Sequence, residues 1–419
     1  MWIDNFQVFL YLDTENTLTL DSTNYLSSLE FTFKLNSAAS SYDAAPFSNS
    51  VIIGLDYDPN ILTISKNQKL DVFFGEKKIG AFYIKDFSPP AEDSTIATIT
   101  AYDLFYNLIN QDIIPDFEIL DGVDIKQYIK QVFDSVGIAE DRLLISEDLA
   151  ENTLNYSVCD GQNLASILKE YCLATDTFIY VDADEKIRVI PKEFIVDGEY
   201  EELNDDVLYG LGLGTTFEET QTGVKVVYNR LTVGETEEIL RTETTLQPNI
   251  MTELTNISLE NPLYQIDQIK TTCPSTLDAV KASQNLLNIY LTSGVSEEIT
   301  DEIVVYGKLI KFVESYVEKQ DESENPNVKS ISTQLIQDTS SAKLLLSLLY
   351  NRMNHRTLTG YLMPDDFDIE LCKIFKVSSN VKGLNPIYAY VHGFRFSIVE
   401  GDVDLELILN EIKEVEVNE

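Results

Sequence analysis

Residues 69–108 read KLDVFFGEKKIGAFYIKDFSPPAEDSTIATITAYDLFYNL, and this stretch decides the fold class. Apolar residues alternate on both sides of a tight turn at Gly75–Lys78, as expected for the two strands of a hairpin. A Pro-Pro-Ala break separates the hairpin from a Thr/Ile strand over Ile96–Ala101. Asp103 follows at the position of an N-cap before an apolar helical turn. The stretch therefore predicts three strands and then a helix.

Composition predicts a large protein rich in sheet. The 419 residues predict two to four domains, or interleaved ones, and a composition of 44% apolar and 24% charged residues is sufficient for buried cores. The net charge is −40, from 70 acidic and 30 basic residues, which argues against binding the outside of nucleic acid or an anionic membrane. Two interpretations of this charge stay open: simple solubility, and an acidic surface that faces a conduit for DNA.

The four cysteines predict no disulfide framework and no C-x-x-C pair. Cys159, Cys172, Cys273 and Cys372 are expected to be free, buried and inert thiols, which suits assembly in a reducing cytoplasm. No signal peptide is expected at the N-terminus, and no apolar run reaches the length of a membrane span.

Changes in hydrophobic period divide the chain into regions. Residues 1–108 are predicted as an N-terminal barrel-like domain, and 109–200 as an α+β insert. Residues 201–317 are predicted as a mixed β segment that returns to the barrel core and contains a helix. A polar linker at 318–327 precedes a C-terminal barrel-like domain, 328–419, with one helix. The predicted fold is α+β and β-rich, with two barrel-like tube domains and inserted helical α+β material.

Specific elements follow from the same patterns. An amphipathic helix is predicted to end at Gly137, and another spans about Asn163 to Cys172. The segment TFIYVDADEKIRVIPK predicts a hairpin with strands Thr177–Val181 and Lys186–Ile190. Leu277–Leu291 has helical spacing, and a strand is predicted over Ile303–Tyr306. In the last region, Thr339/Ser340 are the predicted caps of a helix from about Ser341 to Asn354, and strands follow over 357–410.

No catalytic, cofactor-binding or metal-binding residue is predicted. His355 and His392 are the only histidines, and nothing resembling a nucleophile elbow accompanies them. The remaining candidates have structural explanations. Two acidic turns are predicted, one with Asp182, Asp184 and Glu185 and the other with Asp365, Asp366 and Asp368. A bulged or tightly approached strand is predicted for Gly210, Gly212 and Gly214, and Asp103 is predicted to be a helix cap. The 70 acidic residues create many accidental carboxylate pairs, so such pairs are uninformative.

Four segments, taken in order, resemble the baseplate hub family of contractile and siphophage tails, which is similar to the hub part of type VI secretion spike proteins. The first holds Gly80, Phe82, Ile84 and Ala101-Tyr102-Asp103, and the second is the helix and hairpin of Asn163–Pro191. The third is Thr216–Asn229, which resembles the strand that re-enters the hub core. The fourth holds the helix around Ala342, the Thr357 strand, the Pro364 turn, and strands at Ile374–Val377, Val391–Ser397 and Leu405–Leu409. Two turns depart from the family: Glu185 replaces a usual Gly, and Pro364-Asp365-Asp366 replaces Pro-Gly-Asp.

The resemblance implies a non-enzymatic structural hub of a virion tail, assembled in the host cytoplasm. A homotrimer would form a pseudo-six-fold ring that joins the hexameric tail tube, or a distal tail protein ring, to a three-fold spike or tail tip. A tape measure protein is a further expected partner, and DNA would pass through without specific binding. Strands such as Ile387–Ile398 are expected to pair between subunits. The alternatives are a receptor- or carbohydrate-binding tail or surface protein and a cell-wall hydrolase.

Overall fold

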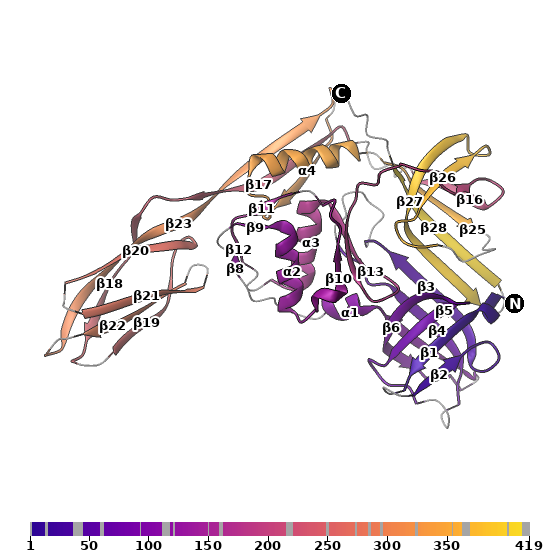
Figure 1. Ribbon diagram of the computed structural model, residues 1–419, viewed down its shortest axis with the longest axis horizontal. Coiled ribbons are helices and arrows are strands. Elements are labelled where there is room, and N and C mark those ends of the chain that lie inside the picture. The colour runs from indigo at the N-terminus through magenta and orange to yellow at the C-terminus, as the bar shows by residue number, and fades with distance from the viewer. Residues whose placement is uncertain are drawn as a thin grey trace.

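The computed structural model is elongated, with a large sheet at one end and a projecting pair of smaller sheets at the other (Figure 1). The structure describes residues 2–12, 16–36, 45–58, 63–92, 94–110, 118–119, 122–149, 151–158, 162–214, 221–248, 251–272, 275–283, 286–293, 296–322, 326–353, 355–362, 369–399 and 402–412.

Both ends of the chain contribute to one sheet of 13 strands. The N-terminal region, which opens with the short 3-10 helix η1 (Trp2–Asn5), supplies β1 (Phe6–Tyr11), β2 (Thr17–Leu20), β3 (Leu26–Lys34), β4 (Ser50–Asp56), β5 (Lys69–Phe74), β6 (Lys77–Ser88) and β7 (Ile96–Tyr102). Later segments supply β15 (Glu202–Leu203), β16 (Leu208–Gly214), β25 (Thr357–Leu362), β26 (Ile374–Ser379), β27 (Leu384–Val399) and β28 (Asp402–Ile412). The main order is β16-β25-β28-β27-β3-β4-β7-β6-β5-β1-β2, and β26 pairs with β27 and β15.

The two end regions meet where β27 pairs with β3, from Gly393 opposite Lys34 to Ile398 opposite Leu29. Their apolar faces share one core. In it the rings of Phe6, Phe31 and Phe396, from β1, β3 and β27, lie 5.1–5.9 Å apart between centroids. The β-rich α+β prediction is therefore confirmed, while the division into two barrels stays a prediction.

The opening segment has the predicted order, with β5, β6 and β7 followed by helix α1 (Leu104–Ile109). Three more helices follow: α2 (Ile125–Ser135), α3 (Leu164–Thr175) and α4 (Thr339–Asn351). The α+β unit also holds η2 (Glu140–Arg142), β8 (Glu118–Ile119), β9 (Val123–Asp124), β10 (Leu143–Ile145), β11 (Thr153–Leu154), β12 (Ser157–Val158) and the hairpin β13 (Thr177–Val181) and β14 (Ile187–Pro191).

Each of these four helices starts at an Asp or Asn whose side chain accepts a backbone N–H of the first turn. For α1 this residue is Asp103, as predicted. For α4 it is Asp338, so the predicted Thr339/Ser340 cap was wrong by one residue. The carboxylate of Asp338 accepts the N–H groups of Ser340 and Ser341 at 2.7 and 2.9 Å.

The projecting part is built on β23 (Ile299–Gln320), a strand of 22 residues. We call β17 (Gly223–Val233), β24 (Val328–Thr333) and residues 310–320 of β23 the neck. We call residues 299–309 of β23 and five further strands the arm: β18 (Glu237–Leu246), β19 (Met251–Ser258), β20 (Leu263–Thr271), β21 (Ser275–Ser283) and β22 (Leu286–Ser293). Figure 1 shows α4 lying along the neck and the arm extending away from the helices.

Four predictions about these segments were wrong. The predicted helix Leu277–Leu291 is replaced by the antiparallel pair β21 and β22. The strand that begins at Gly223 pairs with β23 and β24 in the neck and does not enter the large sheet. The predicted linker 318–327 begins inside β23. Finally, Ile387–Ile398 lies in β27, whose neighbours β26, β28 and β3 come from the same chain, so both of its edges are occupied.

Candidate functional site

The two histidines lie in different environments. His392 is buried on β27, with its Nδ1 atom 3.2 Å from Nδ2 of Asn410 and its ring edge-on to Phe178. His355 follows α4, and its Nε2 atom lies 3.2 Å from the carbonyl oxygen of Asn351 at the helix end. The structure does not bring the two histidines together. The contacts described for them are hydrogen-bond partners and a packed aromatic ring.

The acidic candidates lie at turns and caps. Asp182 closes the β13–β14 turn, because its Oδ1 accepts the N–H groups of Asp184 and Lys186 at 3.0 and 2.9 Å. The described residues include no group of three or more His, Cys, Asp or Glu side chains able to hold a metal ion. The predicted acidic turn with Asp365, Asp366 and Asp368 lies outside the described residues.

Asp103 is a buried capping residue. Its carboxylate accepts hydrogen bonds from Ser48 Oγ at 2.8 Å, from the Asn49 N–H at 2.9 Å and from the Phe105 N–H at 3.0 Å. Burial raises the pKa of Asp103 to about 7, against the opposite effect of these hydrogen bonds. The side chain fixes the junction between β7, α1 and the segment before β4.

Glu185 makes a contact that the sequence did not predict. It adopts φ +61°, the left-handed conformation that favours glycine, and its carboxylate reaches back to strands β5 and β6. There it accepts hydrogen bonds from Lys69 Nζ and, at 2.5 Å, from the hydroxyl of Tyr83. The only signal in the sequence was Glu at a position where the resembling family usually has Gly. Glu185 therefore attaches the hairpin to the large sheet.

A second carboxylate extends this polar network. Asp71 on β5 is buried and lies 3.0 Å from Lys78 Nζ and 2.9 Å from the hydroxyl of Tyr11. Burial would raise the pKa of Glu185, but the hydrogen bonds from Lys69 and Tyr83 and the positive charge of Lys69 hold that pKa below its usual value. Charge-assisted hydrogen bonds in this network join four elements: β1, β5, β6 and the β13–β14 hairpin.

A groove of about 520 Å³ lies between the start of β6, the β13–β14 hairpin and residues 369–371. The rings of Phe33 and Phe394, stacked at 4.8 Å, are among its lining residues. Two ion pairs line it as well: Arg188 with Asp182 at 2.6 Å, and Lys77 with Glu370 at 2.8 Å. These two ion pairs neutralise four of the charged side chains that line the groove.

The ends of the large sheet offer two open edges. Among the described strands, β16 pairs only with β25, and β2 pairs only with β1. The predicted bulge in the Gly210-Leu-Gly212-Leu-Gly214 segment is confirmed, since Gly210 has φ +65° and the register shifts between Tyr209 and Gly212. Tyr209 and Tyr361 stack on the exposed face beside this edge. An open edge strand can accept a strand from another chain.

The described cysteines are free thiols, as predicted. Cys172 is a free, buried thiol on α3, and Cys372 is a free, partly buried thiol in the turn before β26. Cys159 and Cys273 lie outside the described residues. In the part of the chain that the structure describes, no helix combines the length and apolar character needed to cross a membrane.

Comparison with known proteins gives structural matches alone. No family model and no curated protein matches the chain. A tail protein from Neisseria meningitidis MC58 is similar at a TM-score of 0.60 and 8% identity, over 97% of this chain and 96% of that chain. The 43 kDa tail protein of prophage MuSo2 from Shewanella oneidensis is similar at a TM-score of 0.58 and 10% identity, over 96% and 98%.

A third similar structure is the prophage tail protein gp18 from Listeria monocytogenes EGD-e, with a TM-score of 0.50 at 10% identity over 98% and 96% of the two chains. All three matches span nearly the whole of both proteins. They confirm, for the fold, the resemblance to phage tail proteins that the sequence segments predicted.

Proposed function

We propose that this chain, which has the fold of prophage tail proteins, is a structural baseplate or tail hub of a virion tail. The observation that carries the proposal is the likeness over nearly the full length to the tail proteins from Neisseria meningitidis and Shewanella oneidensis. In this proposal the chain is not an enzyme, and it acts by connecting other tail proteins.

The proposed assembly is a homotrimer with a pseudo-six-fold ring. Residues 1–108 and 328–419 are the proposed barrel-like tube domains, so that three copies present six similar surfaces to a hexameric tube or a distal tail protein ring. Residues 109–200 and 201–317 are the proposed insert and mixed segment. A three-fold spike or tail tip binds the other side, and a tape measure protein contacts the hub.

Open edges support this assembly. A short edge strand such as β16 or β2 can pair with a strand of a neighbouring copy, and successive head-to-tail pairings close a ring when the rotation allows it. The net charge of −40 suits a conduit through which DNA passes without binding. The proposed location is the virion tail, after assembly in the host cytoplasm.

Light scattering on the purified chain tests the trimer, and electron microscopy with tube protein tests the ring. Three chains per particle on the tube axis are expected, whereas a monomer at every concentration contradicts the proposal. Tyr209→Lys, beside the open β16 edge, should weaken assembly, while Ile195→Lys, at a loop residue that is 74% exposed, should leave it unchanged. Cell-wall lysis by the purified chain would contradict the non-enzymatic role.

A further inference from the structure

Three β-bulges lie close together where the arm joins the neck. In their registers with β23, strand β18 has one extra residue, Ile239, and β20 has two, Tyr264 and Asp267. All three lie opposite residues 305–309, and the described registers of β23 show no other shift. We call this region the elbow: residues 305–309 of β23 with the paired segments 237–240 and 263–269. Since a bulge bends its strand and increases the local twist, the bending of the projection is concentrated at the elbow.

The apolar pattern of β20 explains its two bulges. Leu263, Ile266 and Ile269 all pack in the core of the arm, although they are spaced three residues apart. Because side chains alternate between the two faces of a strand, residues three apart would normally lie on opposite faces. One extra residue in each interval, first Tyr264 and then Asp267, returns all three apolar side chains to the core face. Burial of this apolar set therefore imposes the irregular pairing.

Gly307 occupies the centre of the elbow. It is paired with Glu237 of β18 on one side and with Ile266 of β20 on the other. A Cβ atom at Gly307 would lie 2.5 Å from the carbonyl oxygen of Gln265 and 2.9 Å from Cδ1 of Ile239. Since a strand glycine permits the close approach of a neighbouring backbone, Gly307 lets the bulged segment of β20 lie against β23.

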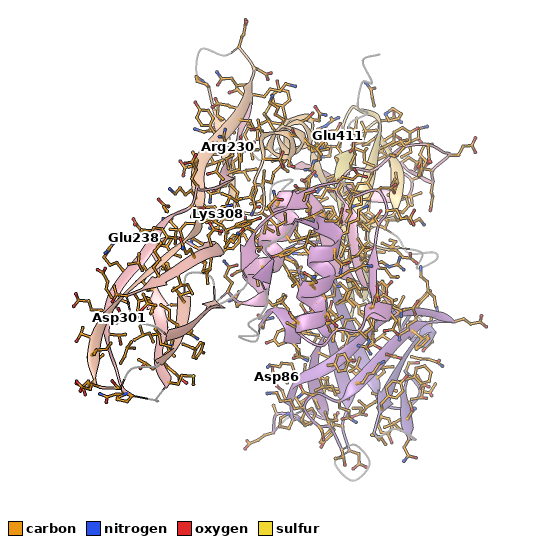
Figure 2. All side chains as sticks on the ribbon, turned by 60° about the vertical axis from the view of Figure 1, so that its left-hand side comes forward. Asp86, Arg230, Glu238, Asp301, Lys308 and Glu411 are labelled. Atoms are coloured by element: carbon orange, nitrogen blue, oxygen red, sulfur yellow. The ribbon has the colours of Figure 1, made fainter. Side chains whose placement is uncertain are left out.

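Polar contacts join the two neighbours of β23 at the elbow. The hydroxyl of Thr236, just before β18, donates to the carboxylate of Asp267 on β20. Because β18 and β20 flank β23, this hydrogen bond crosses β23 beside Gly307. Lys311 of the neck also pairs with Glu237 of the arm at 3.2 Å. These contacts oppose rotation of the arm about β23. Figure 2 shows the order of labelled residues along the projection: Arg230 on the neck, Lys308 and Glu238 at the elbow, and Asp301 further along the arm.

We propose that the elbow is a preset joint that holds the arm at one angle to the neck, and that Gly307 sets this angle. The proposal goes beyond the hub function and does not depend on it. In Gly307→Ala the distance from the new Cβ atom to the Gln265 oxygen must increase from 2.5 Å to at least 3.4 Å, an ordinary van der Waals contact. Neighbouring strands lie about 4.8 Å apart, so this displacement of β20 tilts the arm by roughly 10°. The far end of the arm, about 35 Å away, then moves by roughly 6 Å.

Pulsed electron paramagnetic resonance on the full chain measures the position of the arm. Spin labels are attached to genetically encoded ketone side chains, which leaves the native cysteines in place. One label replaces Glu253 on β19 of the arm, and the other replaces Lys343 on α4 or Gln127 on α2, so that two directions of tilt are detected. Labelled chains are diluted into unlabelled ones, so that neighbouring copies do not contribute. Wild type should give one narrow distance for each pair, and Gly307→Ala should shift at least one of them by up to roughly 6 Å.

Gly393→Ala is the matched control. Its new Cβ atom lies 2.7 Å from the carbonyl oxygen of Phe33, which is the same kind of clash, but in the large sheet. This variant should leave both label distances unchanged even though it lowers the stability of the chain.

The outcomes decide the proposal. A broad distance distribution in wild type, or unchanged distances in folded Gly307→Ala, overturns it. Shifts of the same size in Gly393→Ala also overturn it, because they would follow from general destabilisation. If Gly307→Ala does not fold, Thr236→Val decides, since it removes only an exposed hydrogen bond across β23. Broadened distances in Thr236→Val then support the preset joint, and wild-type distances overturn it.

Discussion

Replacing Glu185 should loosen the β13–β14 hairpin from strands β5 and β6. The Glu185 carboxylate is buried and accepts hydrogen bonds from Lys69 and Tyr83. A hydrogen bond to a charged group contributes about 1.5–3 kcal/mol. Lys69 is 32% exposed and regains water when the carboxylate is removed, which offsets part of the loss. We therefore expect Glu185→Ala to weaken hairpin docking by roughly 2–4 kcal/mol.

The backbone conformation at Glu185 predicts which of two substitutions is the less destabilising. At φ +61° a residue with a Cβ atom carries a steric cost of about 1–2 kcal/mol that glycine avoids. Glu185→Gly should therefore be less destabilising than Glu185→Ala by about 1 kcal/mol. The neighbouring turn residue Asp184 is a matched control, since its φ is not positive. At Asp184 the order should be reversed, because glycine loses more chain entropy than alanine.

Hydrogen exchange across residues 69–88 and 177–191, with thermal unfolding beside it, measures both effects. The pH dependence follows from the pKa of Glu185, which is held below its usual value of 4.5. A lowered carboxyl pKa contributes stability that is present above pH 4.5 and lost as the pH falls through the folded-state value. The advantage of wild type over Glu185→Gln should therefore shrink in acid. Equal protection in the Ala and Gly variants, or unchanged exchange of the hairpin, would refute this reasoning.

Three further changes test other contacts. Gly393→Ala places a Cβ atom 2.7 Å from the carbonyl oxygen of Phe33, so the Tm should fall by several degrees because the β27–β3 junction is disturbed. In the control Gly198→Ala the new Cβ atom meets no atom within 4 Å, so the Tm should not change. Arg352→Met leaves the buried carboxylate of Asp176 without its guanidinium partner and should cost about 3–5 kcal/mol in denaturant titration, with partial recovery when Asp176→Asn is added. Asp103→Ala removes a cap and leaves buried donors, a loss of roughly 3 kcal/mol. Burial raises the pKa of Asp103 from 3.8 to about 7, so the folded state binds a proton more tightly than the unfolded state. The contribution of Asp103 to the free energy of unfolding should therefore decline as the pH rises through that interval. Thermal melts of wild type and Asp103→Ala at pH 5 and pH 8 measure this decline.

Local chemistry explains which elements the sequence predicted well. Asp103 precedes an apolar helical turn, and the acidic turn after Val181 is followed by alternating residues, so each signal lies within a few residues of its effect. The predicted helix Leu277–Leu291 failed for an equally local reason. Leu287 and Leu291 are four residues apart and share a face in a helix and in a strand alike. Ile289, between them, is buried and lies on that face only in a strand.

Long-range pairing explains what the sequence did not predict. The β27–β3 junction joins Arg395 to Glu30 across 365 residues, and nothing near either residue specifies the other. Strand β17 likewise finds its partner in residues 310–320, of which the sequence left 310–317 unassigned and predicted 318–320 as part of a linker. The contact from Glu185 to Tyr83 depends on this tertiary arrangement, so the sequence offered only an unusual turn residue. The open edges of β16 and β2 are visible only once every other strand has its partner.

Strand β23 has a mechanical consequence. Its 22 residues run without a break from the neck into the arm, a length of roughly 70 Å at about 3.3 Å per residue. The same backbone pairs with β17 at one end and with β18 and β20 at the other. A force on the far end of the arm is therefore carried along one covalent strand into the sheet that α4 covers. A load applied at the tip of the projection is therefore transmitted through β23 to the helices.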